Sequence, residues 1–155
     1  MTVKIHDASR PRLTTSRDVV NDPRQQQKAR VLIIDDDATT LELFEQMLVE
    51  QGYVVRAVLT VEAGLTEAAI HAPDAVLLDL HLPLTDGLEC LRRLRAAPLH
   101  LMTPVAILTG DYFIGDEVAR ELKALGARIH FKPVWDADLR QIVEALVSQQ
   151  AGQSQ

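Results

Sequence analysis

The sequence predicts an α/β protein built on a parallel sheet of five strands, with helices on both faces. Short apolar runs alternate five times with amphipathic stretches between residues 30 and 148. Parallel strands need crossover connections, which are usually helices, so this alternation is typical of a doubly wound sheet. Several of the apolar runs are continuous, as expected for strands buried on both faces.

The expected strands share one feature: most of them end at a polar or charged residue. They are expected at residues 31–34, 53–58, 75–78, 104–108 and 128–131. Asp35 and Asp36 follow the first strand, Asp79 the third, Thr109 the fourth and Lys132 the fifth, whereas the second ends without an obvious reactive group.

The expected helices are marked by apolar residues at helical spacing and by residues that begin or end helices. They are expected around residues 41–48, 61–71, 87–96, 114–125 and 139–147, and the last has the clearest apolar stripe. Thr60 and Asp37 are predicted N-caps, and Gly52 and Gly126 are predicted C-terminal stops.

Composition and charge narrow the class of protein. The chain has 155 residues, is 47% hydrophobic and 25% charged, and can bury one ordinary core. Its net charge of -6 gives no reason to expect nucleic acid or an anionic membrane as the main partner. No apolar run resembles a signal peptide or a membrane span. With Cys90 as the one cysteine, no intramolecular disulfide can form, and we expect a cytoplasmic protein.

The two ends differ from the middle. Residues 1–29 carry a net charge of +3 and few bulky apolar side chains, whereas the remainder carries -9. We expect residues 1–29 to be a flexible extension that is dispensable for folding, residues 30–148 to be the folded domain, and residues 149–155 to be a tail that follows a frayed helix end from Ser148. Because the sequence shows no effector domain after residue 148, we expect output through protein–protein contact.

The polar residues at the strand ends predict one site. In open parallel sheets, ligands bind outside the carboxyl ends of the strands. Carboxylates at Asp35, Asp36 and Asp79 would repel one another unless a cation lay among them, and Mg²⁺ suits such oxygen ligands. Lys132 brings a compact positive charge for a phosphoryl oxygen, and Thr109 brings a hydroxyl. A carboxylate nucleophile in this company indicates formation of an aspartyl phosphate.

The order of these motifs resembles the receiver domains of response regulators, the CheY-like family. The resemblance rests on Asp35-Asp36, on Asp79 followed by Leu82-Pro83 and Asp86-Gly87, on the stretch from Pro104 to Thr109, and on Lys132-Pro133, and it covers about residues 30–148. It implies a flavodoxin-like fold with strand order 2-1-3-4-5.

The resemblance also implies a metal site. Asp36 and Asp79 would bind Mg²⁺ directly, Asp35 would hold it largely through water, and the backbone carbonyl of His81 would be a further ligand.

For the phosphoryl group, the resemblance makes Asp79 the phosphoacceptor, with a sensor histidine kinase or a histidine phosphotransferase as donor and a further protein as downstream target. Thr109 and Lys132 would contact phosphoryl oxygens, and the Lys132–Pro133 bond would be cis. The domain would then catalyse only its own phosphorylation and dephosphorylation.

Two features depart from the family pattern. Receivers usually carry an aromatic residue three positions before the lysine, where this chain has Ile129, and the interval from Gly126 to Lys132 is one residue shorter than is common. We therefore expect the signal to reach the surface weakly through the last strand, or through a substitute residue such as Phe131 or His130.

Two alternative functions each agree with part of the sequence. A haloacid-dehalogenase-like phosphatase would use Asp35 as nucleophile and Asp37 as acid–base, but it would leave Asp79 without a role and lacks an acidic pair at a strand end after Lys132. A pseudo-receiver that acts without phosphorylation is favoured only by Ile129.

Other chemically versatile side chains receive structural interpretations. Asp86 is expected to begin a helix, Cys90 to be a small buried hydrophobe, and His130 and Trp135 to pack or lie at the surface. The His81 imidazole is expected to face solvent.

Overall fold

The computed structural model describes residues 28–153, so the expectations for residues 1–27, 154 and 155 lie outside the described part. Its strands are β1 (Arg30–Ile34), β2 (Val54–Val58), β3 (Ala75–Asp79), β4 (Val105–Thr109) and β5 (Ala127–Phe131). Its helices are α1 (Ala38–Glu50), α2 (Val61–His71), α3 (Gly87–Ala96), a short 3₁₀ helix η2 (Pro98–His100), α4 (Asp116–Ala124) and α5 (Asp136–Gln153).

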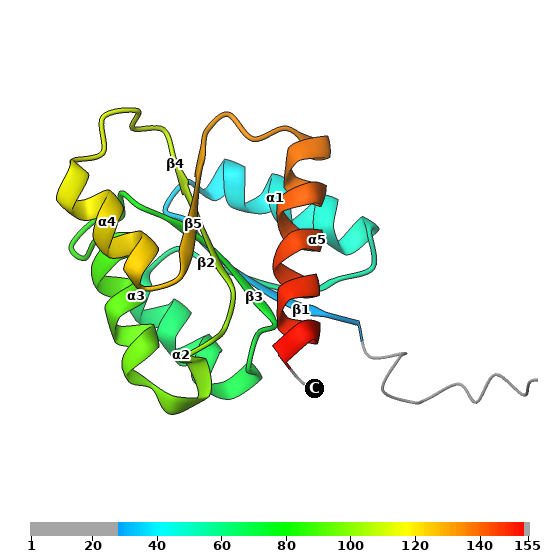
Figure 1. Ribbon diagram of the computed structural model, residues 1–155. Coiled ribbons are helices and arrows are strands. Elements are labelled where there is room, and N and C mark those ends of the chain that lie inside the picture. The colour runs from blue at the N-terminus through cyan, green and yellow to red at the C-terminus, as the bar shows by residue number, and fades with distance from the viewer. Residues whose placement is uncertain (1–27, 154–155) are drawn as a thin grey trace, which may run out of the picture.

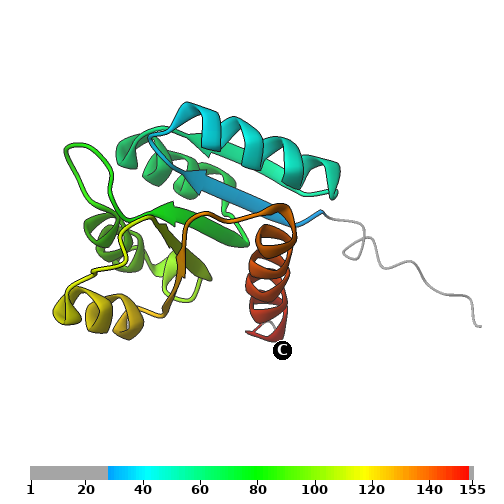
Figure 2. The same ribbon diagram turned by 90° about the horizontal axis from the view of Figure 1, so that it is seen from above.

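The five strands form one sheet in the order β2-β1-β3-β4-β5, and every pair is parallel. Helices α2, α3 and α4 cover one face, and α1 and α5 cover the other (Figures 1 and 2). The predicted fold class and strand order are therefore confirmed.

The continuous apolar runs occupy the centre of the sheet. Every residue of β3 and β4 is buried, and alternate residues serve opposite faces because side chains alternate along a strand. Ile107 packs in the core beneath α2, α3 and α4, and its neighbour Leu108 packs in the core beneath α1 and α5. Two apolar layers thus fix the register of the sheet and the positions at which its strands end.

The predicted helix caps are present. Asp37 accepts a hydrogen bond from the Thr39 amide at 3.0 Å, and Thr60 accepts one from the Ala63 amide at 3.2 Å. Asp86 accepts one from the Glu89 amide at 2.8 Å, which confirms that it begins a helix. Gly52 and Gly126 follow α1 and α4 with positive φ, a conformation that suits glycine after a helix.

Two helix boundaries differ from the sequence prediction. Helix α4 begins at Asp116 and not at Ile114, which lies in the preceding loop yet still packs on the core. The apolar spacing therefore marked a partly buried side chain and not a helical backbone. Helix α5 runs to Gln153, beyond Ser148, so the expected fraying does not begin there.

The sequence analysis missed the segment between α3 and β4. Helix η2 buries His100, whose Nδ1 lies 3.0 Å from the Thr103 hydroxyl and whose Nε2 lies 2.9 Å from the Ala68 carbonyl. Arg95 donates to the carbonyls of His100, Thr103 and Leu125. These bonds join α2, α3, η2 and the end of α4.

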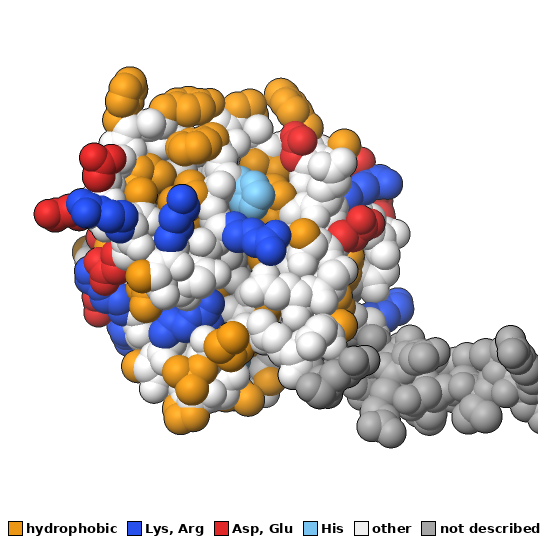
Figure 3. All heavy atoms as spheres, viewed as in Figure 1, with side chains coloured by type: hydrophobic (Ala, Val, Ile, Leu, Met, Phe, Trp, Pro, Cys, Tyr) orange, Lys and Arg blue, Asp and Glu red, His pale blue; other side chains and the backbone are white. Residues whose placement is uncertain are grey.

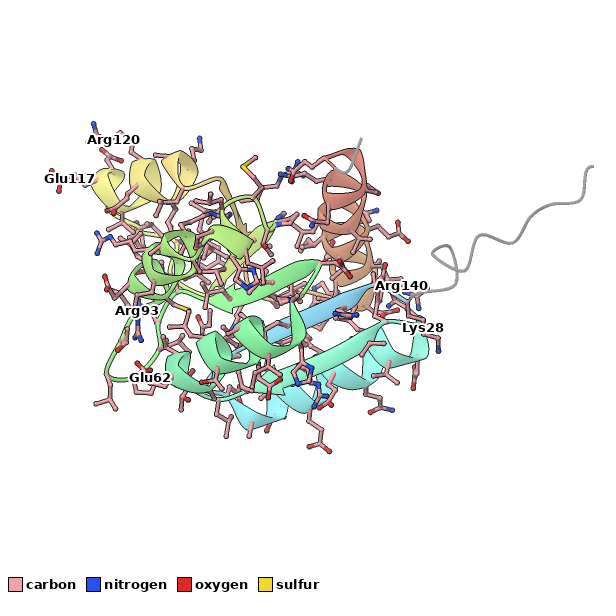
Figure 4. All side chains as sticks on the ribbon, turned by 90° about the horizontal axis from the view of Figure 1, so that it is seen from below. Lys28, Glu62, Arg93, Glu117, Arg120 and Arg140 are labelled. Atoms are coloured by element: carbon pink, nitrogen blue, oxygen red, sulfur yellow. The ribbon has the colours of Figure 1, made fainter. Side chains whose placement is uncertain are left out.

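Surface ion pairs join α2, α3 and α4. Arg93 of α3 and Glu62 of α2 point toward one another (Figure 4), with Nη1 and Oε1 2.6 Å apart, and Arg92 pairs with Glu121 of α4. These pairs are exposed and contribute little to stability.

Cys90 is buried, and burial raises the pKa of its thiol to about 12, which fits the predicted small hydrophobe. Between residues 28 and 153, no helix is long and apolar enough to cross a membrane.

Gly87 allows α3 to begin directly against the end of β3. Its amide donates to the Leu80 carbonyl at 2.8 Å. A Cβ atom at this position would meet the Asp79 carbonyl oxygen and would lie 2.9 Å from the Leu80 Cα, which are backbone atoms that cannot rotate away. The close approach therefore requires glycine.

We predict that Gly87→Ala lowers the free energy of unfolding by about 1–3 kcal/mol, as overpacking against fixed atoms does. Gly110→Ala is the matched control, because a Cβ there has nothing within 4 Å. Urea denaturation of both variants measures the difference. Equal stability of the two variants would show that the backbone at Gly87 adjusts at no cost.

Candidate functional site

Three carboxylates meet at the carboxyl edge of the sheet. Asp35 and Asp36 follow β1, and Asp79 is the last residue of β3, the neighbour of β1. One carboxylate oxygen from each lies within 4.8 Å of the others. The structure thus brings together the three acids that the sequence predicted as metal ligands.

The loop after each strand orients these acids. Asp35 is 2% exposed, and its Oδ1 accepts a hydrogen bond from the Asp37 amide at 2.9 Å. Asp79 is 9% exposed, and its Oδ1 accepts one from the His81 amide at 3.2 Å. Asp36 is exposed. The Oδ2 atoms of Asp35 and Asp79 both contact the Lys132 side chain.

Lys132 reaches these acids from the end of β5. Its Nζ lies 2.8 Å from the Asp35 Oδ2 and 3.6 Å from the Asp79 Oδ2. Its backbone amide donates to the Thr109 carbonyl at 2.7 Å, so the residue starts from a fixed point beside β4. The Lys132–Pro133 peptide bond is cis, as the resemblance implied.

The electrostatics of the cluster favour an added cation. Burial raises the pKa of Asp79, and the charges of Asp35 and Asp36 raise it further, while Lys132 opposes them. Burial lowers the pKa of Lys132, but the hydrogen bond and charge of Asp35 and the charge of Asp79 outweigh it, so that pKa is raised. The cluster thus holds three carboxylates, and the Lys132 ammonium contacts two of them, Asp35 and Asp79. Hard oxygen donors with surplus negative charge are the set that Mg²⁺ prefers.

Thr109 ends β4, next to β3, and is fully buried. Its hydroxyl oxygen accepts a hydrogen bond from the Asp111 amide at 3.1 Å, which leaves the hydroxyl proton free to be donated elsewhere. Because the ladder pairs Asp79 with Leu108, Thr109 stands one residue further along the same edge. The structure therefore places it beside the acids, as the sequence predicted.

Two neighbours of the site, Asp111 and Tyr112, were missed by the sequence analysis. The exposed His81 imidazole lies with its Nε2 3.2 Å from the Asp111 Oδ2, which joins the β3–α3 loop to the β4–α4 loop. Tyr112 donates its hydroxyl to the Lys132 carbonyl at 2.7 Å. The available signal was position: Asp111 stands two residues after Thr109, as His81 does after Asp79.

Asp37, the acid–base residue of the phosphatase alternative, has another role in the structure, and the two acids that follow Lys132 lie in α5 and not at a strand end. Asp37 caps α1, and its hydrogen bond with the Thr40 hydroxyl lowers its pKa, which does not suit a general acid. Asp136 pairs with Arg140, and Asp138 accepts from the Trp135 amide in the first turn of α5. Asp37, Asp136 and Asp138 therefore each have a structural partner.

Ile129 lies on the inner side of the edge strand. It pairs with Ile107 and packs, partly buried, against the core beneath α4. Phe131 shares its face of β5 and stacks on Tyr112 with ring centroids 5.4 Å apart. His130 is on the opposite face, and burial lowers its pKa. Trp135 is exposed, so of the two predicted positions, packed or at the surface, it has the second.

Comparison with known proteins gives a consistent family. The family model described as "Response regulator receiver domain" matches residues 31–144. The cell cycle transcriptional regulator CtrA of Caulobacter vibrioides is 39% identical over 89 residues, which are 57% of this chain and 38% of that protein. The transcriptional regulatory protein PrrA of Mycobacterium tuberculosis is 33% identical over 118 residues, which are 76% of this chain and 49% of that protein. The chain thus spans half or less of these two relatives.

Solved structures of similar proteins share the fold. A CheY-like receiver domain protein from Methanospirillum hungatei is 26% identical with a TM-score of 0.76, and the match covers 82% of this chain and 99% of that one. The chemotaxis protein CheY4 of Vibrio cholerae is 25% identical with a TM-score of 0.72, and the match covers 77% of this chain and 99% of that one. With the family model matching most of the sequence, this chain belongs to the response regulator receiver domain family of two-component signalling.

Proposed function

We propose that this receiver is a Mg²⁺-dependent phosphoacceptor and that Asp79 takes the phosphoryl group from a phosphohistidine of a sensor kinase or a histidine phosphotransferase. The observation that carries the proposal is the position of Asp79 at the end of β3, in a cluster with Asp35 and Asp36 and 3.6 Å from the Lys132 Nζ. The altered surface would then be recognised by a downstream protein.

The reaction is an in-line displacement at phosphorus. A carboxylate oxygen of Asp79 forms the new O–P bond while the N–P bond to the donor imidazole breaks, and the imidazole nitrogen keeps the electron pair. Burial and the neighbouring acids raise the pKa of Asp79, which makes its carboxylate more basic than an exposed one.

The remaining residues would neutralise and orient the transferring group. Asp35, Asp36 and Asp79, with the backbone carbonyl of His81, would hold Mg²⁺, which when bound supplies positive charge to the phosphoryl oxygens. The Lys132 ammonium already faces the Asp79 Oδ2 and would bond another phosphoryl oxygen. The free hydroxyl proton of Thr109 would be donated to a third.

The first prediction from this proposal concerns covalent labelling. Acetyl phosphate with Mg²⁺ should add one phosphoryl group to the wild-type chain and none to Asp79→Asn, which intact-mass spectrometry detects. Asp37→Asn is the matched control, since its carboxylate caps α1 and lies outside the cluster, and it should be labelled like wild type. Labelling of Asp79→Asn, together with its loss in Asp35→Asn, would support the phosphatase alternative instead.

The second prediction concerns stability in EDTA. Because the pKa of Asp79 is raised in the folded protein, the folded state binds more protons than the unfolded state between the two pKa values. Stability is therefore lost as pH rises through that window, and the loss persists at neutral pH. Asp79→Asn removes the charge but keeps an oxygen that can accept from the His81 amide.

We expect Asp79→Asn to raise the free energy of unfolding at neutral pH by about 1 kcal/mol, which is a few degrees in thermal midpoint. The advantage should shrink as pH falls through the raised pKa of folded Asp79 and vanish below about pH 4, where the carboxyl is protonated in both states. Asp37→Asn should have the opposite sign, because the pKa of Asp37 is lowered in the folded protein. A neutral or destabilising Asp79→Asn would show that the cluster is not short of positive charge.

A further inference from the structure

Tyr112 connects the β4–α4 loop to the lysine of the site. We propose that Tyr112 is a positioning residue for Lys132: by holding the Lys132 carbonyl, it fixes the point from which the ammonium reaches Asp35 and Asp79. The inference rests on the proposed phosphoacceptor function and deepens it, because it assigns a role to a residue outside the set that the sequence predicted.

The backbone of Lys132 is held at both of its polar groups. Its amide donates to the Thr109 carbonyl at 2.7 Å, and its carbonyl accepts from the Tyr112 hydroxyl at 2.7 Å. The next residue, Pro133, has no amide proton with which to continue the sheet. The tyrosine therefore supplies a partner where the β4–β5 ladder ends.

A second contact orients the tyrosine ring. It stacks on Phe131, the last residue of β5, with centroids 5.4 Å apart and planes at 15°. Both rings remain partly in water, at 62% exposed for Tyr112 and 45% for Phe131. Hydrophobic side chains gather on this end of the molecule (Figure 3). Stacking gives the phenol one direction, in which its hydroxyl meets the Lys132 carbonyl.

The position of the Lys132 backbone matters because the side chain is long and flexible. Its ammonium must pass the end of β4 to approach Asp35 at 2.8 Å and Asp79 at 3.6 Å. A backbone that moves freely would make the ammonium sample more positions and would lower the fraction of time spent where a phosphoryl oxygen binds.

The same loop also contacts the other side of the site. Asp111 lies 3.2 Å from His81 of the β3–α3 loop, and its amide donates to the Thr109 hydroxyl. The β4–α4 loop is thus joined to the ends of β3, β4 and β5. With Ile129 packed in the core, Tyr112 provides an aromatic contact between this loop and the end of β5.

The test is a double-mutant cycle on the rate of labelling by acetyl phosphate with Mg²⁺. Tyr112→Phe keeps the ring and removes the hydroxyl, and it is made in the wild-type chain and in Lys132→Ala. One neutral hydrogen bond corresponds to a rate change of about 2- to 10-fold. Tyr53→Phe is the matched control, because Tyr53 packs beside the core under α1, away from the β5 end.

We expect Tyr112→Phe to slow labelling of the wild-type chain by about 2- to 10-fold and to have no effect in Lys132→Ala, since the lysine through which it acts is gone. Mg²⁺ affinity and the thermal midpoint should stay as in the Tyr53→Phe control. An equal slowing in both backgrounds, or no slowing in the wild-type chain, would overturn the role for Tyr112. Labelling of Asp79→Asn in the same assay would overturn the proposed function itself.

Discussion

A surplus of negative charge gathers at the carboxyl edge of the sheet. One carboxylate oxygen from each of Asp35, Asp36 and Asp79 lies within 4.8 Å of the others, and the Lys132 ammonium contacts Asp35 and Asp79. Burial of Asp35 and Asp79 makes their repulsion costly, so stability alone would not favour the arrangement. A divalent cation would offset it, because Mg²⁺ and the Lys132 ammonium together carry as much positive charge as the three carboxylates carry negative charge.

The parallel sheet brings these charged residues together. Because all five strands are parallel, residues that are far apart in sequence emerge at one edge, and two apolar layers prevent the strands from slipping in register. The loops then hold the side chains: amides of Asp37 and His81 orient the two buried acids. The absence of a side chain at Gly87 lets α3 begin against the backbone of Asp79.

Much of this could be predicted from the sequence because the relevant signals are local. A continuous apolar run and the polar residue after it define a buried strand and its end, which sufficed for Asp79, Thr109 and Lys132. The predicted start of α4 was wrong because Ile114, which fits the apolar spacing of the helix, lies in the loop before it. Its partly buried side chain packs against the core from that loop. Helix η2, the Arg95 bonds and the Tyr112 contact depend on partners distant in sequence, and no local pattern encodes them.

The effect of Mg²⁺ on thermal stability at neutral pH, measured against NaCl at matched ionic strength, shows whether the three acids bind a cation. A cation that binds the folded state alone raises the free energy of unfolding by RT ln(1 + [Mg²⁺]/Kd). We expect the thermal midpoint of the wild-type chain to rise with Mg²⁺ concentration. Asp36→Asn, which removes the exposed acid of the cluster, should largely abolish the rise. An equal rise in both proteins, or none in the wild type, would contradict the claim that these three acids form a metal-dependent site.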